Sequence, residues 1–268
     1  MSGPDFCRRK PVNSRKMNDS EIEAMIPTKL KHDAIMEAVF EIRFHSSDLP
    51  EVVVGRLADR EEWAAFSKSQ QPISNLPAQF RRADPNLRFE PLLQLQDQTS
   101  GRLVRIGEQV ISYHVMAPYC GWTQFHNELD ALISWLFKRF TDFKVLRLGL
   151  RYIDALRSDL HSITDLSSLN LKVSVGEKEI GENFMLHFFE SLSDSHDQII
   201  RVTSKKFVSG PIPDGATVVT DIDIFTPDSY ETCSAGYVGD WLNKAHAFGK
   251  TSFFNLLPEA VLQALAES

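Results

Sequence analysis

Alternating hydrophobic and polar residues mark a series of predicted β-strands along the chain. In residues 35–44 (IMEAVFEIRF), Phe40, Ile42 and Phe44 occupy alternate positions, and Glu41 and Arg43 lie between them. Because successive strand residues point to opposite faces, this segment predicts a strand with one apolar and one polar face. By the same criterion we expect strands over residues 87–96, 103–106, 110–116, 144–154, 183–192, 198–208 and 216–225.

Apolar residues at helical spacing predict two long helices, over residues 122–140 and 236–256. In the first of these, the apolar positions recur three and four residues apart, so its aromatic residues, Trp122 included, are expected to face the core. Shorter helices are expected from Pro50 and over 258–266, a loop over 67–87, and a polar connection with one short helix over 157–181.

The order of these elements is the same in both halves of the chain: a strand, a helix or connection, three strands, and a long helix. The connections within each triplet of strands are too short for crossovers, so the sheet should be antiparallel. Long amphipathic helices can bury one face of such a sheet and leave the other face open. We therefore predict a two-layer α+β fold with helices on one face and an internal duplication, like the sheet of TATA-box-binding protein or the helix-grip fold. The two halves would span residues 29–143 and 144–268 and form one continuous globular unit.

Composition supports a folded protein. The chain has 268 residues, of which 43% are hydrophobic and 24% are charged, so general disorder is excluded. Its three cysteines are far apart and form neither a disulfide framework nor a zinc-binding pattern, which is typical of a reducing compartment. No apolar run reaches the roughly 18 residues of a membrane helix. We therefore expect a cytoplasmic protein without a membrane partner.

The net charge of −7 is unevenly distributed. Residues 1–17 contain five basic residues and one acidic residue, and residues 1–28 are expected to form a mobile basic tail. A solvated terminus, or an extension ahead of a start at Met17, is favoured over a tether for nucleic acid. The acidic remainder argues against binding to duplex DNA by bulk charge.

No standard catalytic or nucleotide-binding motif is present, so the acidic strand 218–225 (VVTDIDIF) is the sharpest chemical feature. Asp221 and Asp223 project from one strand face about 7 Å apart. With Glu41 or Asp154 as a third ligand they could hold Mg²⁺ or Mn²⁺ for a phosphodiesterase or nuclease. The favoured interpretation is that both aspartates pair with arginine or lysine residues on neighbouring strands, with no cofactor.

Basic residues on predicted strands form a second candidate site. Arg147 and Arg151 are four residues apart and share a strand face, and Arg201 and Lys205 do so on another strand. An open face with these side chains could bind the phosphates of a nucleotide or a single strand, although a solvated mixed-charge face is favoured. The candidate ligand-binding residues are Glu41, Arg43, Arg147, Arg151, Asp154, Arg201 and Lys205, and the candidate metal ligands are Asp221 and Asp223.

Four segments carry a resemblance: 33–44 (DAIMEAVFEIRF), 109–122 with its PYCGW end, 148–154 (LGLRYID) and Asp221-Ile-Asp223. They resemble the EAV-x-EIRF, PY-x-GW, LRY-I-N and L-D-I-D motifs of a sporadically distributed family of conserved, uncharacterised bacterial and archaeal proteins. The resemblance covers about residues 28–268, with Asp154 in place of the usual Asn and Thr220 in place of an apolar residue. It implies a small stand-alone protein, often in mobile or defence-linked gene neighbourhoods, with no established activity. The positions that it marks are Glu37, Glu41, Arg43, Arg151, Tyr152, Asp154, Asp221 and Asp223.

These observations predict a non-catalytic binding or interaction protein that uses the open sheet face or the groove between its halves. Its partner would be a protein or a second copy of the chain, with nucleic acid or a nucleotide as further possibilities. The alternatives are the metal-dependent phosphodiesterase or nuclease and a scaffold that dimerises through a sheet edge.

Overall fold

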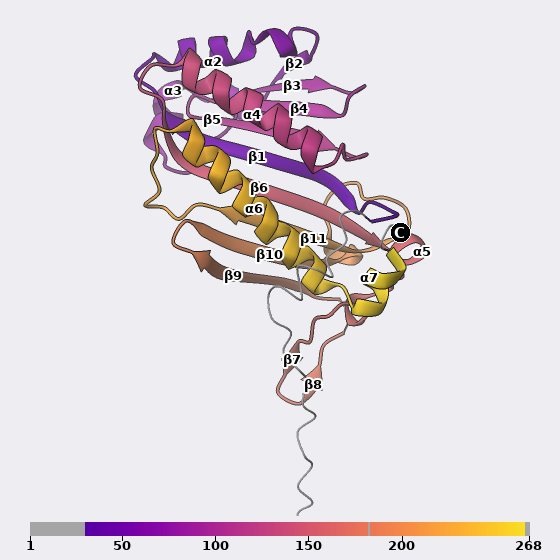
Figure 1. Cartoon of the computed structure of the whole chain (residues 1–268). Coiled ribbons are helices and arrows are strands. Elements are labelled where there is room, and N and C mark those ends of the chain that lie inside the picture. Colours follow the sequence, from indigo (N-terminus) through magenta and orange to yellow (C-terminus); the bar gives the residue numbers. More distant parts are fainter. Residues whose placement is uncertain (1–29, 182, 266–268) are drawn as a thin grey trace, which may run out of the picture.

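A computed structural model describes residues 30–181 and 183–265, so the predicted basic tail over residues 1–28 lies outside the described residues. Nine strands form one antiparallel sheet (Figure 1). They are β1 (Ile35–His45), β2 (Ser67–Gln70), β3 (Leu93–Asp97), β4 (Arg102–Ile106), β5 (Val110–Met116), β6 (Lys144–Arg157), β9 (Met185–Ser193), β10 (His196–Ser204) and β11 (Ala216–Phe225). A separate hairpin is formed by β7 (Ser174–Val175) and β8 (Lys178–Glu179).

The strand order in the sheet is β2-β3-β4-β5-β1-β6-β11-β10-β9. The first strand of each predicted half, β1 or β6, lies at the centre, and the two pair with each other, with Phe40 opposite Leu150. On one side β5, β4 and β3 follow β1, and on the other side β11, β10 and β9 follow β6. Apart from the edge strand β2 and the β7–β8 hairpin, which were not expected, the element order is the predicted one; an internal duplication stays a prediction.

Two long helices, α4 (Trp122–Arg139) and α6 (Ala235–Leu256), lie across one face of the sheet (Figure 1). The alternate residues Phe40, Ile42 and Phe44 of β1 are at most 1% exposed and belong to the same hydrophobic core as the buried residues of both helices. Burial of these side chains provides the main stabilisation of the two layers. The predicted two-layer α+β architecture is confirmed. The remaining helices are α2 (Pro50–Ala58), α3 (Ala78–Ala83), α5 (Ser158–His161) and α7 (Glu259–Leu265), with 3₁₀ turns η1 (Glu61–Trp63), η2 (Pro72–Asn75), η3 (Leu166–Ser168) and η4 (Lys205–Phe207).

The structure corrects four local predictions. The expected strand 87–96 starts only at Leu93 and ends at Asp97, as β3. Residues 67–87 are not a continuous loop, because they contain the edge strand β2, the turn η2 and the helix α3. The expected strand 198–208 starts earlier and ends at Ser204, so Lys205 belongs to a 3₁₀ turn and does not continue the face of Arg201. Strand β6 extends to Arg157, past the expected end at Asp154. Strand β2 could not be predicted from the sequence, because it is exposed along its whole length and carries no apolar alternation.

Candidate functional site

Most of the predicted site residues lie on the sheet face opposite α4 and α6, which we call the open face. Alternation explains the placement, since on β1 the residues Phe40 and Ile42 point to the helices and Glu41 points away. The open face carries Glu41, Arg43, Arg147, Arg151, Arg201, Asp221 and Asp223.

Asp221 is held by arginines from two neighbouring strands. Arg151 donates from Nε to Asp221 Oδ1 at 2.6 Å and from Nη2 to Oδ2 at 2.7 Å. Arg201 donates from Nη1 to the same Oδ2 at 3.2 Å. Bidentate, charge-assisted hydrogen bonds of this kind are among the stronger polar interactions in proteins. Asp221 is therefore paired with arginines on neighbouring strands, as the favoured interpretation of the sequence expects.

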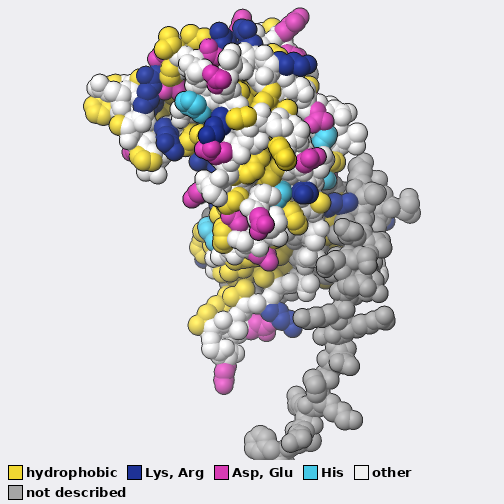
Figure 2. All heavy atoms as spheres, turned by 60° about the vertical axis from the view of Figure 1, so that its left-hand side comes forward, with side chains coloured by type: hydrophobic (Ala, Val, Ile, Leu, Met, Phe, Trp, Pro, Cys, Tyr) yellow, Lys and Arg dark blue, Asp and Glu magenta, His cyan; other side chains and the backbone are white. Residues whose placement is uncertain are grey.

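A second group lies beside it on β1 and β6. Glu41 accepts from Arg43 at 2.8 Å and from Arg147 at 3.0 Å, and the Arg147 guanidinium lies 4.8 Å from the centroid of the Phe225 ring. Burial raises the pKa of Asp223, although Arg147 and Arg151 act in the opposite direction. On the side of the molecule shown in Figure 2, acidic, basic and hydrophobic side chains are interspersed.

Of the two expected third metal ligands, Glu41 lies on the open face but pairs with Arg43 and Arg147, and Asp154 is not on that face. Thr220, rather than Asp221, is the β11 partner of Asp154, so Asp154 points to the helices and not to the open face. In the described part of the chain, no group of three or more His, Cys, Asp or Glu side chains is arranged to hold a metal ion. Asp154 and Lys205 are therefore separated from the other predicted ligand-binding residues.

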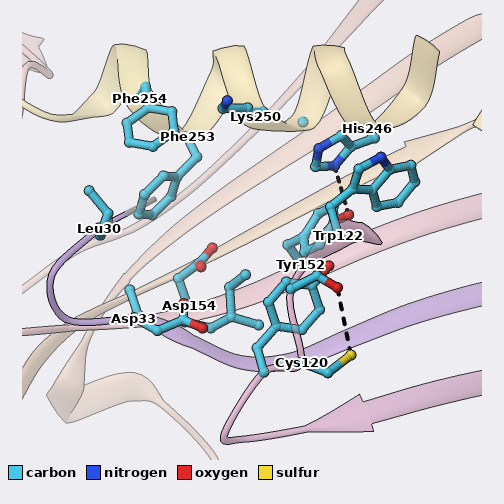
Figure 3. Close-up of a pocket in the computed structure, with 15 residues that line it drawn as sticks. Leu30, Asp33, Cys120, Trp122, Tyr152, Asp154, His246, Lys250, Phe253 and Phe254 are labelled. Carbon is cyan, nitrogen blue, oxygen red and sulfur yellow. Dashed lines mark hydrogen bonds between the residues drawn. The ribbon is translucent and has the colours of Figure 1, made fainter. Parts of the chain in front are cut away.

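A cavity of about 450 Å³ lies on the helix-covered side of the sheet (Figure 3). We call it the inter-half pocket, because its walls come from both predicted halves: the start of β1, the loop 117–121 and the start of α4 on one side, and β6 and α6 on the other. Its apolar lining includes Leu30, Ile35, Phe253 and Phe254. Gly121 helps to shape the wall, because its φ of 85° lets the chain turn from the loop into α4.

Asp154 contributes a carboxyl group to this pocket and is only 3% exposed. Thr220 Oγ1 donates to its Oδ2 at 3.3 Å. Burial, followed by repulsion from the Asp33 carboxylate, raises the pKa of Asp154 to about 8. Asp154 is therefore mostly protonated at neutral pH, unlike an ordinary aspartate.

The opposite end of the pocket is aromatic. The rings of Trp122 and His246 stack with centroids 3.8 Å apart and planes 4° apart. His246 Nδ1 is 3.0 Å from the Tyr152 hydroxyl. Burial, with the charge of Lys250 as a smaller cause, lowers the pKa of His246 to about 4, so the imidazole is neutral at pH 7.

Two residues of the loop 117–121 complete the lining. The Tyr119 hydroxyl is buried and makes no hydrogen bond with good geometry among the described residues, although the Tyr152 hydroxyl is near enough to affect its pKa. Burial raises the pKa of both the Tyr119 hydroxyl and the Cys120 thiol. The Cys120 thiol contacts the Gly121 carbonyl at 3.7 Å. These groups are therefore neutral near pH 7.

The sequence interpretation missed most of this pocket. Trp122 was expected in the core, but it lies at the pocket and stacks on His246. Helical spacing reports only that a side chain faces the sheet, so it cannot separate a core position from a pocket wall. One signal was present: Asp154 continues the face of Leu148, Leu150 and Tyr152, and a carboxyl group on an apolar strand face needs an explanation.

Comparison with known proteins does not identify the chain. A scan against models of protein families finds no match, and a search of curated proteins finds none that is significantly similar. The resemblance of its motifs therefore remains an expectation, and the functional argument rests on the geometry of the open face and the inter-half pocket.

Proposed function

We propose that this protein is a non-catalytic binding protein whose ligand occupies the inter-half pocket. The observation that carries the proposal is that one mostly apolar cavity holds the buried carboxyl group of Asp154 and the Tyr119 hydroxyl, which finds no hydrogen bond of good geometry among the described residues. Ligand sites are typically concave and apolar, with a few polar groups and volumes of about 300–1,000 Å³. Buried polar groups that lack good partners in the free protein can find them in a ligand.

The chemistry of the lining supports binding rather than catalysis. A nucleophilic cysteine needs a lowered pKa or a neighbouring base, whereas burial raises the pKa of Cys120. His246 engages Tyr152 through Nδ1 and stacks on Trp122, so its polar contact is already made to another lining residue.

We also propose a partner protein, or a second copy of this chain, for the open face, and a cytoplasmic setting for both roles. The support is that the Arg151 side chain remains 42% exposed while it pairs with Asp221. An exposed guanidinium whose position is fixed by a less exposed carboxylate is well suited to recognise a partner carboxylate or phosphate.

A labelling competition tests the pocket proposal. Cys120 lines the pocket and Cys233 is exposed elsewhere, so the two thiols provide a site and an internal reference in one protein. We expect small molecules that bind the full-length chain to slow the reaction of Cys120 with N-ethylmaleimide, measured by mass spectrometry. The reaction of Cys233 should be unchanged.

Two glycines of α6 provide a matched pair of variants. A Cβ at Gly249 would lie 3.5 Å from the Tyr152 ring at the pocket wall, whereas a Cβ at Gly239 would meet nothing within 4 Å. Gly249→Leu should fill the pocket and abolish both binding and protection, while Gly239→Leu should leave them intact. Ligands that bind Gly249→Leu as well as the wild type, or that protect neither cysteine, would refute the proposal.

A further inference from the structure

The polar end of the inter-half pocket carries two carboxyl groups, one just before β1 and one on the neighbouring strand β6. Asp33 precedes β1 and is exposed at the pocket, and its Oδ1 accepts a hydrogen bond from the Ile35 backbone at 3.0 Å. Asp154, on β6, is nearly completely buried. Figure 3 shows both side chains on the same side of the cavity, and the charge of Asp33 is one cause of the raised pKa of Asp154.

Aromatic side chains form much of the remaining wall. Trp122, Tyr119, Tyr152 and Phe253 come from α4, the loop before it, β6 and α6. Aromatic ring faces attract organic cations, and a carboxylate adds a charged partner at one end. The one lysine of the lining, Lys250, has its ammonium group 6.0 Å from the Phe254 ring centroid.

We propose that the inter-half pocket binds a small organic amine, with its ammonium group at Asp154 and its apolar body against the aromatic walls. This inference rests on the proposed function and names the ligand class for the same site. An ammonium group donates up to three hydrogen bonds, which suits a pocket whose lining includes the Asp154 carboxyl group and the Tyr119 hydroxyl. A bound cation also offsets the repulsion between the two carboxyl groups.

Protonation makes the proposal measurable. Because burial and Asp33 raise the pKa of Asp154 to about 8, an amine that pairs with it at pH 7 must displace its proton. We expect release of about one proton per ligand, and an affinity that falls about tenfold per pH unit below pH 8. The other titratable groups around the cavity are Asp33, Tyr119, Cys120, Tyr152, His246 and Lys250, with Asp221 acting through the sheet. Tyr119, Cys120 and Tyr152 have raised pKa values and His246 has a lowered one, so none of these four changes charge between pH 6 and 8.

The test compares three probes that share one indole ring: tryptamine, tryptophol and indolepropionate. Calorimetry with the full-length chain, in buffers of different ionisation enthalpy, gives both the affinity and the number of protons released. We expect tryptamine to bind at least tenfold more tightly than the other two, with proton release. Asp154→Asn should lose this preference, the proton release and the pH dependence, while Asp223→Asn on the open face should keep all three.

The outcomes separate this inference from the proposed function. If tryptophol or indolepropionate binds in the pocket and tryptamine does not, the pocket is a ligand site and the amine inference is wrong. Binding of tryptamine that persists in Asp154→Asn with its proton release would also overturn the inference. If none of the three probes binds, the amine inference is wrong. If binding survives Gly249→Leu, the probes do not occupy the pocket and both proposals fail.

Discussion

At the scale of single residues, Asp154 is the most informative position. Its carboxyl group lies on the apolar face of β6 with Thr220 as a hydrogen-bond partner, and burial makes the charged form unfavourable. An acid with a raised pKa binds its proton more tightly in the folded state than in the unfolded chain. Its contribution to stability is therefore present below the unfolded pKa near 4 and is lost as the pH rises to about 8.

Asp154→Asn should remove this pH dependence, because an amide of similar shape carries no charge. We expect the stability of the variant relative to the wild type to rise between pH 5 and pH 8.5, by on the order of a few kcal/mol. Urea unfolding at both pH values measures the difference. A variant whose relative stability does not rise over this range would show that the Asp154 carboxylate is well accommodated.

Arg151 and Asp221 form the best-defined ion pair of the open face. Arg151→Ala should lower the free energy of unfolding by about 1 kcal/mol, which is less than charged hydrogen bonds usually contribute. The loss is small because the Arg151 side chain is 42% exposed and because Arg201 still pairs with Asp221 in the variant. The exposed Arg139→Ala on α4 is the control, with an expected change within about 0.5 kcal/mol. An Arg151→Ala variant that fails to fold would assign Arg151 a structural role and remove the open face as a recognition surface.

At the scale of elements, the strands are fixed by pairing along the sheet, and their turns leave little room. Gly107 lies between β4 and β5, and its backbone N–H donates to the Val110 carbonyl at 2.9 Å. A Cβ there would lie 2.7 Å from both the Glu90 carbonyl oxygen and Val110 Cγ1. Any larger residue at this position therefore requires the neighbouring backbone to shift.

Gly107→Ala should destabilise the protein by about 1–3 kcal/mol, because the backbone must move to relieve the contact with Glu90. Gly239→Ala on α6 is the matched control and should be stabilising by about 0.5–1 kcal/mol, since alanine favours a helix and meets nothing there. Thermal unfolding of both variants checks the opposite signs. Equal effects would show that the turn at Gly107 can rearrange.

At the scale of the whole molecule, buried groups with opposite pKa shifts limit stability on both sides of neutral pH. Burial lowers the pKa values of His114, His161, His196 and His246, so stability is lost as the pH falls below their unfolded pKa near 6.5. Asp154 acts in the other direction as the pH rises towards 8.

The wild type should therefore be most stable near pH 6.5, where the histidines are still neutral and Asp154 is still protonated. The midpoint of thermal unfolding, measured from pH 5 to pH 9, should fall on both sides of this value. In Asp154→Asn the decline above pH 6.5 should disappear, while the decline on the acidic side should remain. A wild-type profile that is flat between pH 6.5 and pH 8 would contradict the raised pKa of Asp154.

No described helix is long and apolar enough to cross a membrane, in agreement with the absence of long apolar runs in the sequence.

The sequence by itself determined the strands with clear alternation, the two long helices and the side of each strand that faces the core. These features depend on the local period of apolar residues, as in Phe40, Ile42 and Phe44. A short stretch of sequence is enough to show that period.

Only the tertiary structure decided which side chains meet. Asp33, Trp122, Asp154 and His246 are distant in the sequence. They line one pocket because β1 pairs with β6 while α4 and α6 lie next to each other on the same face of the sheet. Lys205 was separated from Arg201 by a strand end that depends on pairing with β9 and β11, not on local composition. Local patterns report the preferences of a segment, whereas the environment of a titratable group depends on the burial and charge that distant segments bring to it.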